Sequence, residues 1–343
     1  LHCAFIGFGK STTRYHLPYV LHRKERWQVA HIYRRRAKPE EQAPQYSHIH
    51  FTSDLDEVLN DPLVKLVVVC THADSHFEYA KKALEAGKNV LVEKPFTPTL
   101  EEAKTLFALA NSKGLTVTPY QNRRFDSCFL TTKKVIESGK LGELVEIESH
   151  FDNYRPLAET NPGGPQNGEF YGLGVHTLDQ IISLFGRPDH VSYDLRSLRN
   201  KANPDDTFEA QLFYGDMKAI VKTSHLVQID YPKFIVHGHK GSFVKYGIDQ
   251  QETSLKANIM PGEPGFGADD SVGELVYVNE AGEMVREAVP LESGDYGRVY
   301  DALYDTLVNG HPNYVKETDV LTNMEILQRG FEQPSPATIT LTR

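Results

Sequence analysis

The stretch VVVCTHADSHFEYAKKALEAGKNVLVEKPFTPT, residues 67–99, contains the unit from which the first third of the chain is built. The apolar run Leu66 to Cys70, which overlaps its start, shows no alternation with polar residues and is typical of a buried strand. A helix is predicted over Ser75 to Ala86 and ends at Gly87. A second strand over Asn89 to Glu93 completes a strand–helix–strand unit, which favours a parallel sheet.

The same alternation continues on both sides of this stretch. Further strands are predicted over residues 3–7, 27–33 and 115–118, and further helices over residues 53–60, 99–112 and a stretch reaching about residue 23. Ser53 or Asp54 and Thr99 are the expected helix N-caps, and Gly114 is an expected stop. Repeated units with short loops imply a parallel sheet with helices on both faces, so the fold class is α/β.

The pattern changes after about residue 122. Helices are predicted over residues 127–137, 172–185, 295–309 and 319–331, and a strand over residues 144–151. Short β-type runs fill the region from Val191 to Val289, and with no helices predicted between them they indicate one antiparallel or mixed sheet. We therefore predict two domains, residues 1–122 and residues 123–343, a number that fits a length of 343 residues.

Composition excludes several classes of protein. Hydrophobic residues make up 40% and charged residues 24%, as in an ordinary globular enzyme. A formal net charge of −9 disfavours binding to nucleic acid or to an anionic membrane surface. No apolar run approaches the ~20 residues of a membrane-spanning helix, and no signal peptide is visible.

The number and spacing of the cysteines favour a reducing cellular compartment. Cys3, Cys70 and Cys128 are odd in number and show no C-x-x-C spacing, and two of them lie inside apolar runs. We therefore expect reduced cysteines and a cytoplasmic protein.

A glycine pair follows the first strand. Gly7-Phe8-Gly9 stands between that strand and a helix, which is the context of a dinucleotide-binding turn. Glycines there allow backbone N–H groups to approach a pyrophosphate at a helix N-terminus. Thr12 occupies the position of the usual third glycine, so the motif alone is a weak signal, and a plain strand–turn–helix connection is the alternative.

The end of the second strand is basic. NAD-binding folds usually place an acid there to hold the ribose 2′-OH, whereas this chain has Tyr33-Arg34-Arg35-Arg36 and no acid before Glu40. Guanidinium groups pair with a 2′-phosphate by charge-assisted hydrogen bonds. Arg34 and Arg35 therefore favour NADP over NAD, which remains possible, and a solvated basic loop is the alternative.

Residues 67–99 also carry a family pattern. The matching residues are Thr71, His76, Ala80, Ala83, Leu84, Ala86, Gly87, Lys88, Val90, Glu93, Lys94 and Pro95. With Asn122-Arg123-Arg124-Phe125 and Gly174-x-His176-x-x-Asp179, the sequence resembles the Gfo/Idh/MocA oxidoreductases along the whole chain, most closely their uncharacterised bacterial members. His72 and Ala73 replace the Pro and Asn that the family usually carries after the threonine.

The resemblance implies a Rossmann domain followed by an α/β domain with a large, mostly antiparallel open sheet, with the active site between them. It implies hydride transfer between a nicotinamide and a hydroxyl-bearing carbon of a sugar, an inositol or a related polyol. It also implies a dimer or higher homo-oligomer. The cofactor-binding residues expected on these grounds are Gly7, Gly9, Thr12, Arg34, Arg35, Thr71, His72, His76, Glu93 and Lys94.

Two residues are expected to be catalytic. Lys94 follows an apolar strand, and partial burial would favour the neutral amine that accepts the hydroxyl proton. His176 has Asp179 three residues later on a predicted helix, so the two side chains can share a face, and Asp179 could orient the imidazole. An exposed loop lysine and a plain core histidine are the respective alternatives.

The substrate side shows one departure from the family. The expected substrate residues are Asn122, Arg124, Tyr171 and Asp179. Many relatives carry an acid two residues before the motif glycine, as in D-x-G-x-H, whereas this chain has Gly172. Reduction of a non-sugar carbonyl or imine within the same fold is one alternative function. The missing acid supports another, a catalytically silent NADP-binding sensor. The retained Lys94 argues against the silent sensor.

No metal site is expected. His72 and His76 are four residues apart and His237 and His239 two apart, but neither pair has the further ligands of a zinc site.

Overall fold

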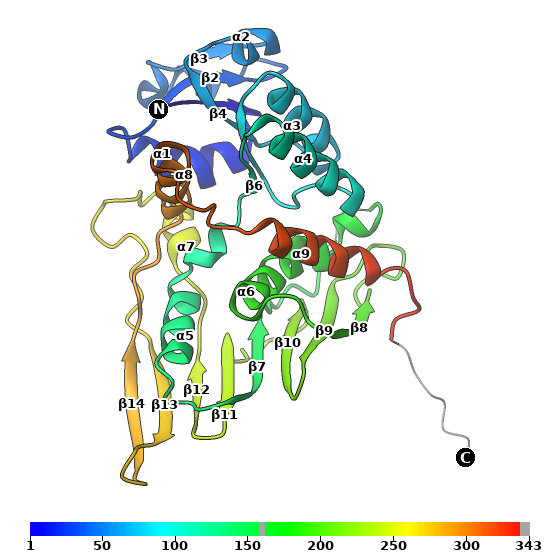
Figure 1. The fold of residues 1–343 in the computed structure, drawn as a ribbon, viewed down its shortest axis with the longest axis vertical. Coiled ribbons are helices and arrows are strands. Elements are labelled where there is room, and N and C mark those ends of the chain that lie inside the picture. Colours follow the sequence, from blue (N-terminus) through cyan, green and yellow to red (C-terminus); the bar gives the residue numbers. More distant parts are fainter. Residues whose placement is uncertain (158–161, 337–343) are drawn as a thin grey trace. The chain divides into compact units, whose positions relative to one another are not determined.

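The structure is a computed structural model that describes residues 1–157 and 162–336, which form two compact units (Figure 1). The first unit contains Leu1–Asn122, Thr253–Phe266 and Tyr296–Leu321. The second contains Arg123–Glu252, Gly267–Asp295 and the described residues from Thr322 onward. These units are not continuous in sequence, so the division into domains at residue 122 stays a prediction.

The first unit is built on a six-stranded parallel sheet with the strand order β3-β2-β1-β4-β5-β6. This is the order of the doubly wound dinucleotide-binding fold, and it confirms the predicted parallel α/β architecture. The strands are β1 His2–Ile6, β2 Gln28–Tyr33, β3 His50–Thr52, β4 Val64–Val69, β5 Asn89–Val92 and β6 Val117–Pro119.

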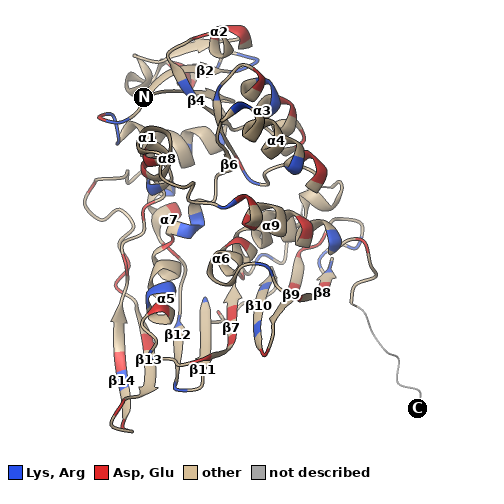
Figure 2. Cartoon of the chain, viewed as in Figure 1, with Lys and Arg blue, Asp and Glu red and all other residues tan. Residues whose placement is uncertain are grey.

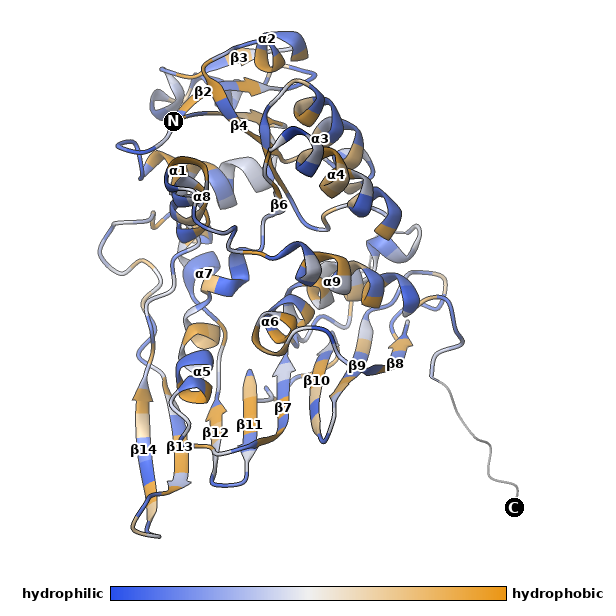
Figure 3. Ribbon diagram, in the orientation of Figure 1, coloured by the Kyte–Doolittle hydropathy of each residue, from blue (hydrophilic) through white to orange (hydrophobic). Residues whose placement is uncertain are grey.

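Burial explains why this sheet reads as apolar runs. In β4 every residue except Lys65 is buried, because helices cover both faces of a parallel sheet. Figure 3 shows the corresponding apolar strands. The covering helices of this unit are α1 Leu17–Leu21, α2 Leu55–Leu59, α3 His76–Glu85 and α4 Leu100–Lys113. A π-helical turn over Thr12–His16 precedes α1, and Pro18 stands in the first turn of α1, where proline is tolerated.

A helix from much later in the chain completes the first unit. In α8, Arg298–Asn309, the Tyr300 carbonyl accepts a hydrogen bond from Trp27 Nε1 at 3.0 Å. Asp301 Oδ2 accepts from Arg23 Nε and Nη2 at 3.0 and 2.8 Å. These contacts fasten α8 beside the first helical segment of the chain.

The second unit is built on an eight-stranded sheet with the order β14-β13-β12-β11-β7-β10-β9-β8. Only β7 and β10 pair in parallel, and the other neighbours are antiparallel, so the prediction of a mixed, mostly antiparallel sheet is confirmed. The strands are β7 Leu144–His150, β8 His190–Arg196, β9 Thr207–Tyr214, β10 Met217–Ser224, β11 Phe234–Gly238, β12 Gly241–Lys245, β13 Val272–Val278 and β14 Met284–Pro290. The helices beside them are α5 Ser127–Glu137, α6 Val175–Phe185 and the last part of α9 Glu317–Arg329.

The two faces of this sheet differ. Alternate residues of β9 and β10, such as Leu212 and Val221, are fully buried in one core with Leu178 of α6. The residues between them point to the other face, where Lys218 pairs with Glu146 at 2.7 Å. Figure 2 shows acidic positions on β7 and basic positions on β10. This two-residue period is the alternation that the sequence shows.

Two elements were not predicted. Strand β3 has three residues and stands directly before α2, so its pattern is too short to separate from the helix start. Helix α7, Gln251–Lys256, lies inside the region expected to contain only strands. Predicted helix 172–185 begins with a π-helical turn over Phe170–Gly174, and α6 follows from Val175.

Within the described residues, no helix combines the length and apolar character needed to cross a bilayer.

The capping box of α4 gives a test of local stability. Thr99 Oγ1 accepts a hydrogen bond from Glu102 N at 3.3 Å, and Glu102 Oε2 accepts from Thr99 N at 3.0 Å. Thr99→Ala removes the side-chain acceptor and should lower the free energy of unfolding by about 1 kcal/mol, measured by urea denaturation. Thr105→Ala, in the interior of α4, is the matched control and should leave stability unchanged or slightly higher. Equal effects of the two variants would contradict the capping role.

Candidate functional site

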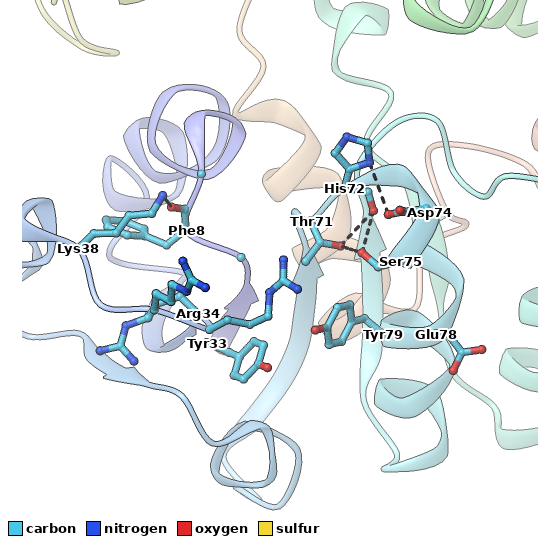
Figure 4. Close-up of a pocket in the computed structure, with 14 residues that line it drawn as sticks. Phe8, Tyr33, Arg34, Lys38, Thr71, His72, Asp74, Ser75, Glu78 and Tyr79 are labelled. Carbon is cyan, nitrogen blue, oxygen red and sulfur yellow. Dashed lines mark hydrogen bonds and ion pairs between the residues drawn. The ribbon is translucent and has the colours of Figure 1, made fainter. Parts of the chain in front are cut away.

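A groove of about 1050 Å³ lies at the carboxyl ends of β1, β2 and β4 (Figure 4). In an open parallel sheet this is where ligands bind, because the strand order reverses between β1 and β4. The lining residues follow those three strands in turn: Gly7, Phe8 and Gly9; Tyr33, Arg34, Arg35, Arg36 and Lys38; and Thr71, His72, Asp74, Ser75, Glu78 and Tyr79.

The turn after β1 requires glycine. Gly7 has a φ of +111°, and a Cβ there would lie 2.5 Å from the Cys70 carbonyl oxygen. Its N–H donates to the Tyr33 carbonyl at 2.9 Å, which joins the ends of β1 and β2. A Cβ on Gly9 would meet no atom within 4 Å, so this part of the turn is open. The backbone can therefore approach a ligand phosphate closely.

Thr12 lies under this turn. Its side chain is fully buried, and its Oγ1 donates to the Gly7 carbonyl at 2.9 Å. Thr12 does not line the groove. The predicted cofactor residue at this position therefore stabilises the glycine turn from below.

Arg34 pairs with Glu41, an acid that the sequence analysis does not single out. Its Nε and Nη2 donate to the two carboxylate oxygens of buried Glu41 at 2.7 and 3.0 Å. This hydrogen bonding raises the pKa of Arg34 and lowers the pKa of Glu41. Arg35 and Arg36 line the same groove and are more exposed. Of the three arginines on this basic edge, Arg34 is therefore held by an ion pair, and Arg35 and Arg36 are exposed.

The residues after β4 form the opposite edge of the groove in Figure 4. Ser75 Oγ donates to Thr71 Oγ1 at 2.8 Å, and the exposed His72 ring lies 3.5 Å from an Asp74 carboxylate oxygen. Thr71 and His72, both predicted for cofactor binding, thus line the groove with hydrogen-bonding groups.

His76 is buried and contacts the backbone of two turns. Its Nδ1 contacts the Pro95 carbonyl at 2.8 Å, and its Nε2 lies 3.2 Å from the Thr71 carbonyl. Burial lowers the pKa of this histidine, which favours a neutral ring that donates one N–H. His76 therefore ties the turn after β4 to the turn after β5, and it does not line the groove.

Glu93 is a buried carboxylate at the end of β5. Its Oε1 accepts from Ser11 Oγ and contacts His16 Nε2 at 3.1 Å, while its Oε2 accepts from the Lys94 backbone N–H at 2.9 Å. Burial alone would raise the pKa of Glu93, but the contacts with His16 and Ser11 and the charge of Lys94 lower it to about 2. Glu93 therefore joins the helical segment after the glycine turn to the turn that presents Lys94.

This network extends to a residue that sequence reasoning missed. His16 Nδ1 contacts the Tyr300 hydroxyl at 2.7 Å, and its ring lies against Tyr120 with 4.0 Å between ring centroids. His16 is fully buried, and 284 residues separate it from Tyr300. No local pattern links these positions, so a single sequence offered no signal for the pair.

Lys94 directly follows Glu93 and is partly buried. Its backbone is fixed by the Glu93 carboxylate, at the strand end where the parallel sheet presents its ligand-binding residues. The predicted catalytic lysine therefore stands on a supported turn. Asn122, predicted to contact substrate, is buried at the end of the first stretch of this unit.

Arg124 and Asp179 form a pair in the second unit. Arg124 Nε and Nη2 donate to the two Asp179 oxygens at 2.8 Å each, and the Asp179 side chain is almost fully buried. Both carboxylate oxygens of Asp179 accept hydrogen bonds from Arg124, and the expectation that Asp179 orients His176 stays a prediction. His176 itself is buried in the first turn of α6.

Tyr171, predicted to contact substrate, lies in the core of the second unit. Its ring is 2% exposed, belongs to the core of the second unit and stacks on Phe331 at 6.0 Å. Burial raises the pKa of its hydroxyl to about 12. The ring therefore packs against apolar neighbours, and its expected contact with substrate stays a prediction.

In the described part of the chain, no group of three or more His, Cys, Asp or Glu side chains is arranged to hold a metal ion.

Two family profiles match the chain. An oxidoreductase-family profile for the NAD-binding Rossmann fold covers residues 1–121, and one for the family's C-terminal alpha/beta domain covers residues 133–340. These matches agree with the six-stranded sheet and its glycine turn, and with the eight-stranded sheet.

Relatives match over nearly the whole length. The chain is 83% identical to the uncharacterized oxidoreductase YhhX of Escherichia coli K12, covering 100% of this chain and 99% of that protein. The crystal structure of the probable oxidoreductase yhhX superposes with a TM-score of 0.97 over 100% of both chains. An oxidoreductase from Bacillus cereus, 50% identical, superposes with a TM-score of 0.96 over 100% of this chain and 99% of that one.

One relative has a named reaction. The scyllo-inositol 2-dehydrogenase (NADP(+)) IolW of Bacillus subtilis is 32% identical over 95% of this chain and 92% of that protein. With both family profiles matched and these relatives covered almost end to end, the chain is an oxidoreductase with an NAD-binding Rossmann domain and belongs to the Gfo/Idh/MocA family.

Proposed function

We propose that this oxidoreductase uses NADP(H) to interconvert a polyol hydroxyl and the corresponding ketone, with an inositol or a sugar as substrate. The observation that carries the proposal is the groove at the strand-order reversal, which is lined by an open glycine turn and by exposed arginines. The inositol class is supported by IolW, whose printed name specifies scyllo-inositol and NADP.

Preference for NADP follows from the basic edge. Arg34 is already paired with Glu41 through Nε and Nη2, so the negative charge of that carboxylate offsets the attraction of Arg34 for a phosphate. Arg35 is exposed on the same edge. Arg35 is therefore the residue that binds the 2′-phosphate, and Arg34 positions the loop that carries it.

The reaction needs a hydride acceptor and a proton acceptor. NADP⁺ held by the glycine turn and Arg35 would supply the hydride acceptor, and Lys94 accepts the proton of the substrate hydroxyl on its side-chain nitrogen. Glu93 holds the Lys94 backbone in place, so it acts as a positioning residue. In the reverse direction Lys94 returns the proton to the carbonyl oxygen.

His176 is the second polar group assigned to the substrate. It stands on the first turn of α6, and Arg124 and Asp179 form a buried pair one turn further along that helix. The pair fixes the helix that carries His176. His176 hydrogen-bonds the substrate and shares in moving the proton.

The proposal extends to the setting of the enzyme. We place it in the cytoplasm as a dimer or larger homo-oligomer, with no nucleic-acid or membrane partner. Cys3, Cys70 and Cys128 are all buried free thiols, as a reducing compartment allows.

The first test is a substrate panel. Purified protein is mixed with scyllo-inositol, myo-inositol, several aldoses or small carbonyl compounds, and NADP(H) or NAD(H) absorbance is followed. We expect turnover of at least one inositol or sugar with NADP. Turnover confined to non-sugar carbonyls, or no turnover at all, would contradict the polyol assignment.

Cofactor choice can be tested by titration. Arg35→Ala should weaken NADPH binding by roughly 10- to 150-fold, the equivalent of one lost charge-assisted contact, and leave NADH binding unchanged. Arg187→Ala is the control, because it removes an exposed guanidinium that does not line the groove. Equal or tighter binding of NADH by the parent protein would show that the preference is wrong.

Lys94→Ala should lower turnover by roughly 10²- to 10⁴-fold while cofactor binding persists, since a general base is lost and the glycine turn is intact. The control is Lys82→Ala on the exposed side of α3, which should behave like the parent. Near-normal turnover by the Lys94 variant would make this lysine structural.

His176→Ala should lower turnover and remove one limb of the pH–rate profile, because a titrating group is lost from the site. Gln180→Ala, on the same helix, is buried and does not titrate, so it should lower stability without altering the shape of the profile. An unchanged profile and rate for His176→Ala would refute the role assigned to His176.

A further inference from the structure

A carboxylate stands beside the position where the family motif usually has its acid. A Cβ built on Gly172 would lie 3.2 Å from Oε2 of Glu169, three residues earlier in the chain. Glu169 directly precedes the π-helical turn that contains Gly172, so its side chain folds over the start of that turn. The chain lacks an acid at residue 172 but retains a carboxylate next to that place.

The backbone around Glu169 is fixed by Asp205. Glu169 N–H donates to the Asp205 carbonyl at 2.9 Å, and Phe170 N–H donates to Asp205 Oδ2 at 2.7 Å. A Cβ on Gly168 would lie 2.0 Å from Asp205 Oδ1, so glycine is required before Glu169. These contacts set where the Glu169 side chain begins.

A buried histidine faces the same carboxylate. His225 follows β10, is 5% exposed, and places Nε2 3.4 Å from Glu169 Oε1. Among the described residues, neither ring nitrogen of His225 has a hydrogen-bond partner. Buried polar groups are nearly always hydrogen-bonded, so this ring indicates a polar ligand that would complete the site.

Burial, together with two nearby arginines, keeps the imidazole of His225 neutral. Burial, followed by the charges of Arg199 and Arg155, lowers the pKa of His225 to about 4, against the opposing charges of Asp206 and Asp152. The histidine therefore does not neutralise Glu169 at neutral pH.

The neighbouring acids behave differently from each other. Burial and the charges of Glu169 and Asp206 raise the pKa of Asp205 to about 7, although its hydrogen bond from Phe170 opposes this. Burial would raise the pKa of Asp206, but hydrogen bonds from Leu198 and Arg199 lower it. Asp205 is thus the acid beside Glu169 that takes up a proton first as the pH falls below neutrality.

We infer that Glu169, backed by His225, supplies the substrate-binding carboxylate that relatives carry at residue 172. Residues 172 and 176 are four apart at the start of one helix, so an acid at 172 would stand on the side of His176. Glu169 accepts a hydrogen bond from a substrate hydroxyl, and a ring nitrogen of His225 hydrogen-bonds the same or the next polar group. No bond forms to Glu169, and the hydroxyl proton still leaves to Lys94. The inference rests on the proposed polyol function.

The test moves the carboxylate between the two positions. Glu169→Gln and Glu169→Ser should each lower kcat/KM for the working polyol by about 10- to 150-fold, as expected for a lost charge-assisted hydrogen bond. Adding Gly172→Asp to Glu169→Ser restores a carboxylate and should recover about tenfold or more of that loss. Glu57→Gln, which removes a carboxylate paired with exposed His50, is the control and should match the parent.

Further measurements separate binding from folding. The thermal unfolding midpoint of each variant is recorded, because a purely structural Glu169 would lower it and Gly172→Asp would not repair turnover. The loss should appear in KM for polyols, and it should be smaller for a substrate that lacks the neighbouring hydroxyl.

The possible outcomes are distinct. If the parent turns over a polyol and both Glu169 variants match it, or if Gly172→Asp gives no recovery, the inference is wrong and the proposed function stands. If the parent turns over no polyol, the proposed function fails, and the inference fails with it.

Discussion

The buried Glu93 carboxylate is the contact on which the proposed site depends. One of its oxygens accepts a hydrogen bond from Ser11 and contacts His16, both in the helical segment that follows the glycine turn. The other oxygen accepts a hydrogen bond from the Lys94 backbone N–H. A buried charge is stable only when several groups satisfy it, so these contacts hold one another in place. The glycine turn and the backbone of the proposed base, Lys94, are therefore held in fixed positions relative to each other. The contact between His16 and the Tyr300 hydroxyl extends this network to α8.

A second constraint is electrostatic and concerns the groove edge. Three arginines in a row would repel one another, and buried Glu41 neutralises the first of them. Lys38 Nζ donates to the Phe8 carbonyl at 2.5 Å, which joins the loop after β2 to the glycine turn. The loop is therefore held at both ends, and the exposed arginines are presented on a fixed backbone, which reduces the entropy lost when an anion binds.

Sequence patterns predict structural features that are set by residues close together in the chain. The unalternated run in β4, the Asp54 and Thr99 caps and the glycine turn are local features, and the structure has them. Contacts between distant residues left no such pattern: the partners of His16 and Arg124 lie 284 and 55 residues away. The position of Tyr171 next to a motif does not show which way its ring packs, and the structure places the ring in a core. The family pattern places its acid at residue 172, so the sequence alone does not single out Glu169, whose carboxylate lies beside that position.

In the proposed reaction a hydride passes directly between a polyol carbon and NADP. This transfer is tested by supplying a polyol deuterated at the carbon whose hydroxyl is oxidised, and by locating the label by NMR after turnover with NADP⁺. We expect the deuterium to be recovered on the nicotinamide ring of NADPH. Deuterium released into water, or unlabelled NADPH, would contradict it.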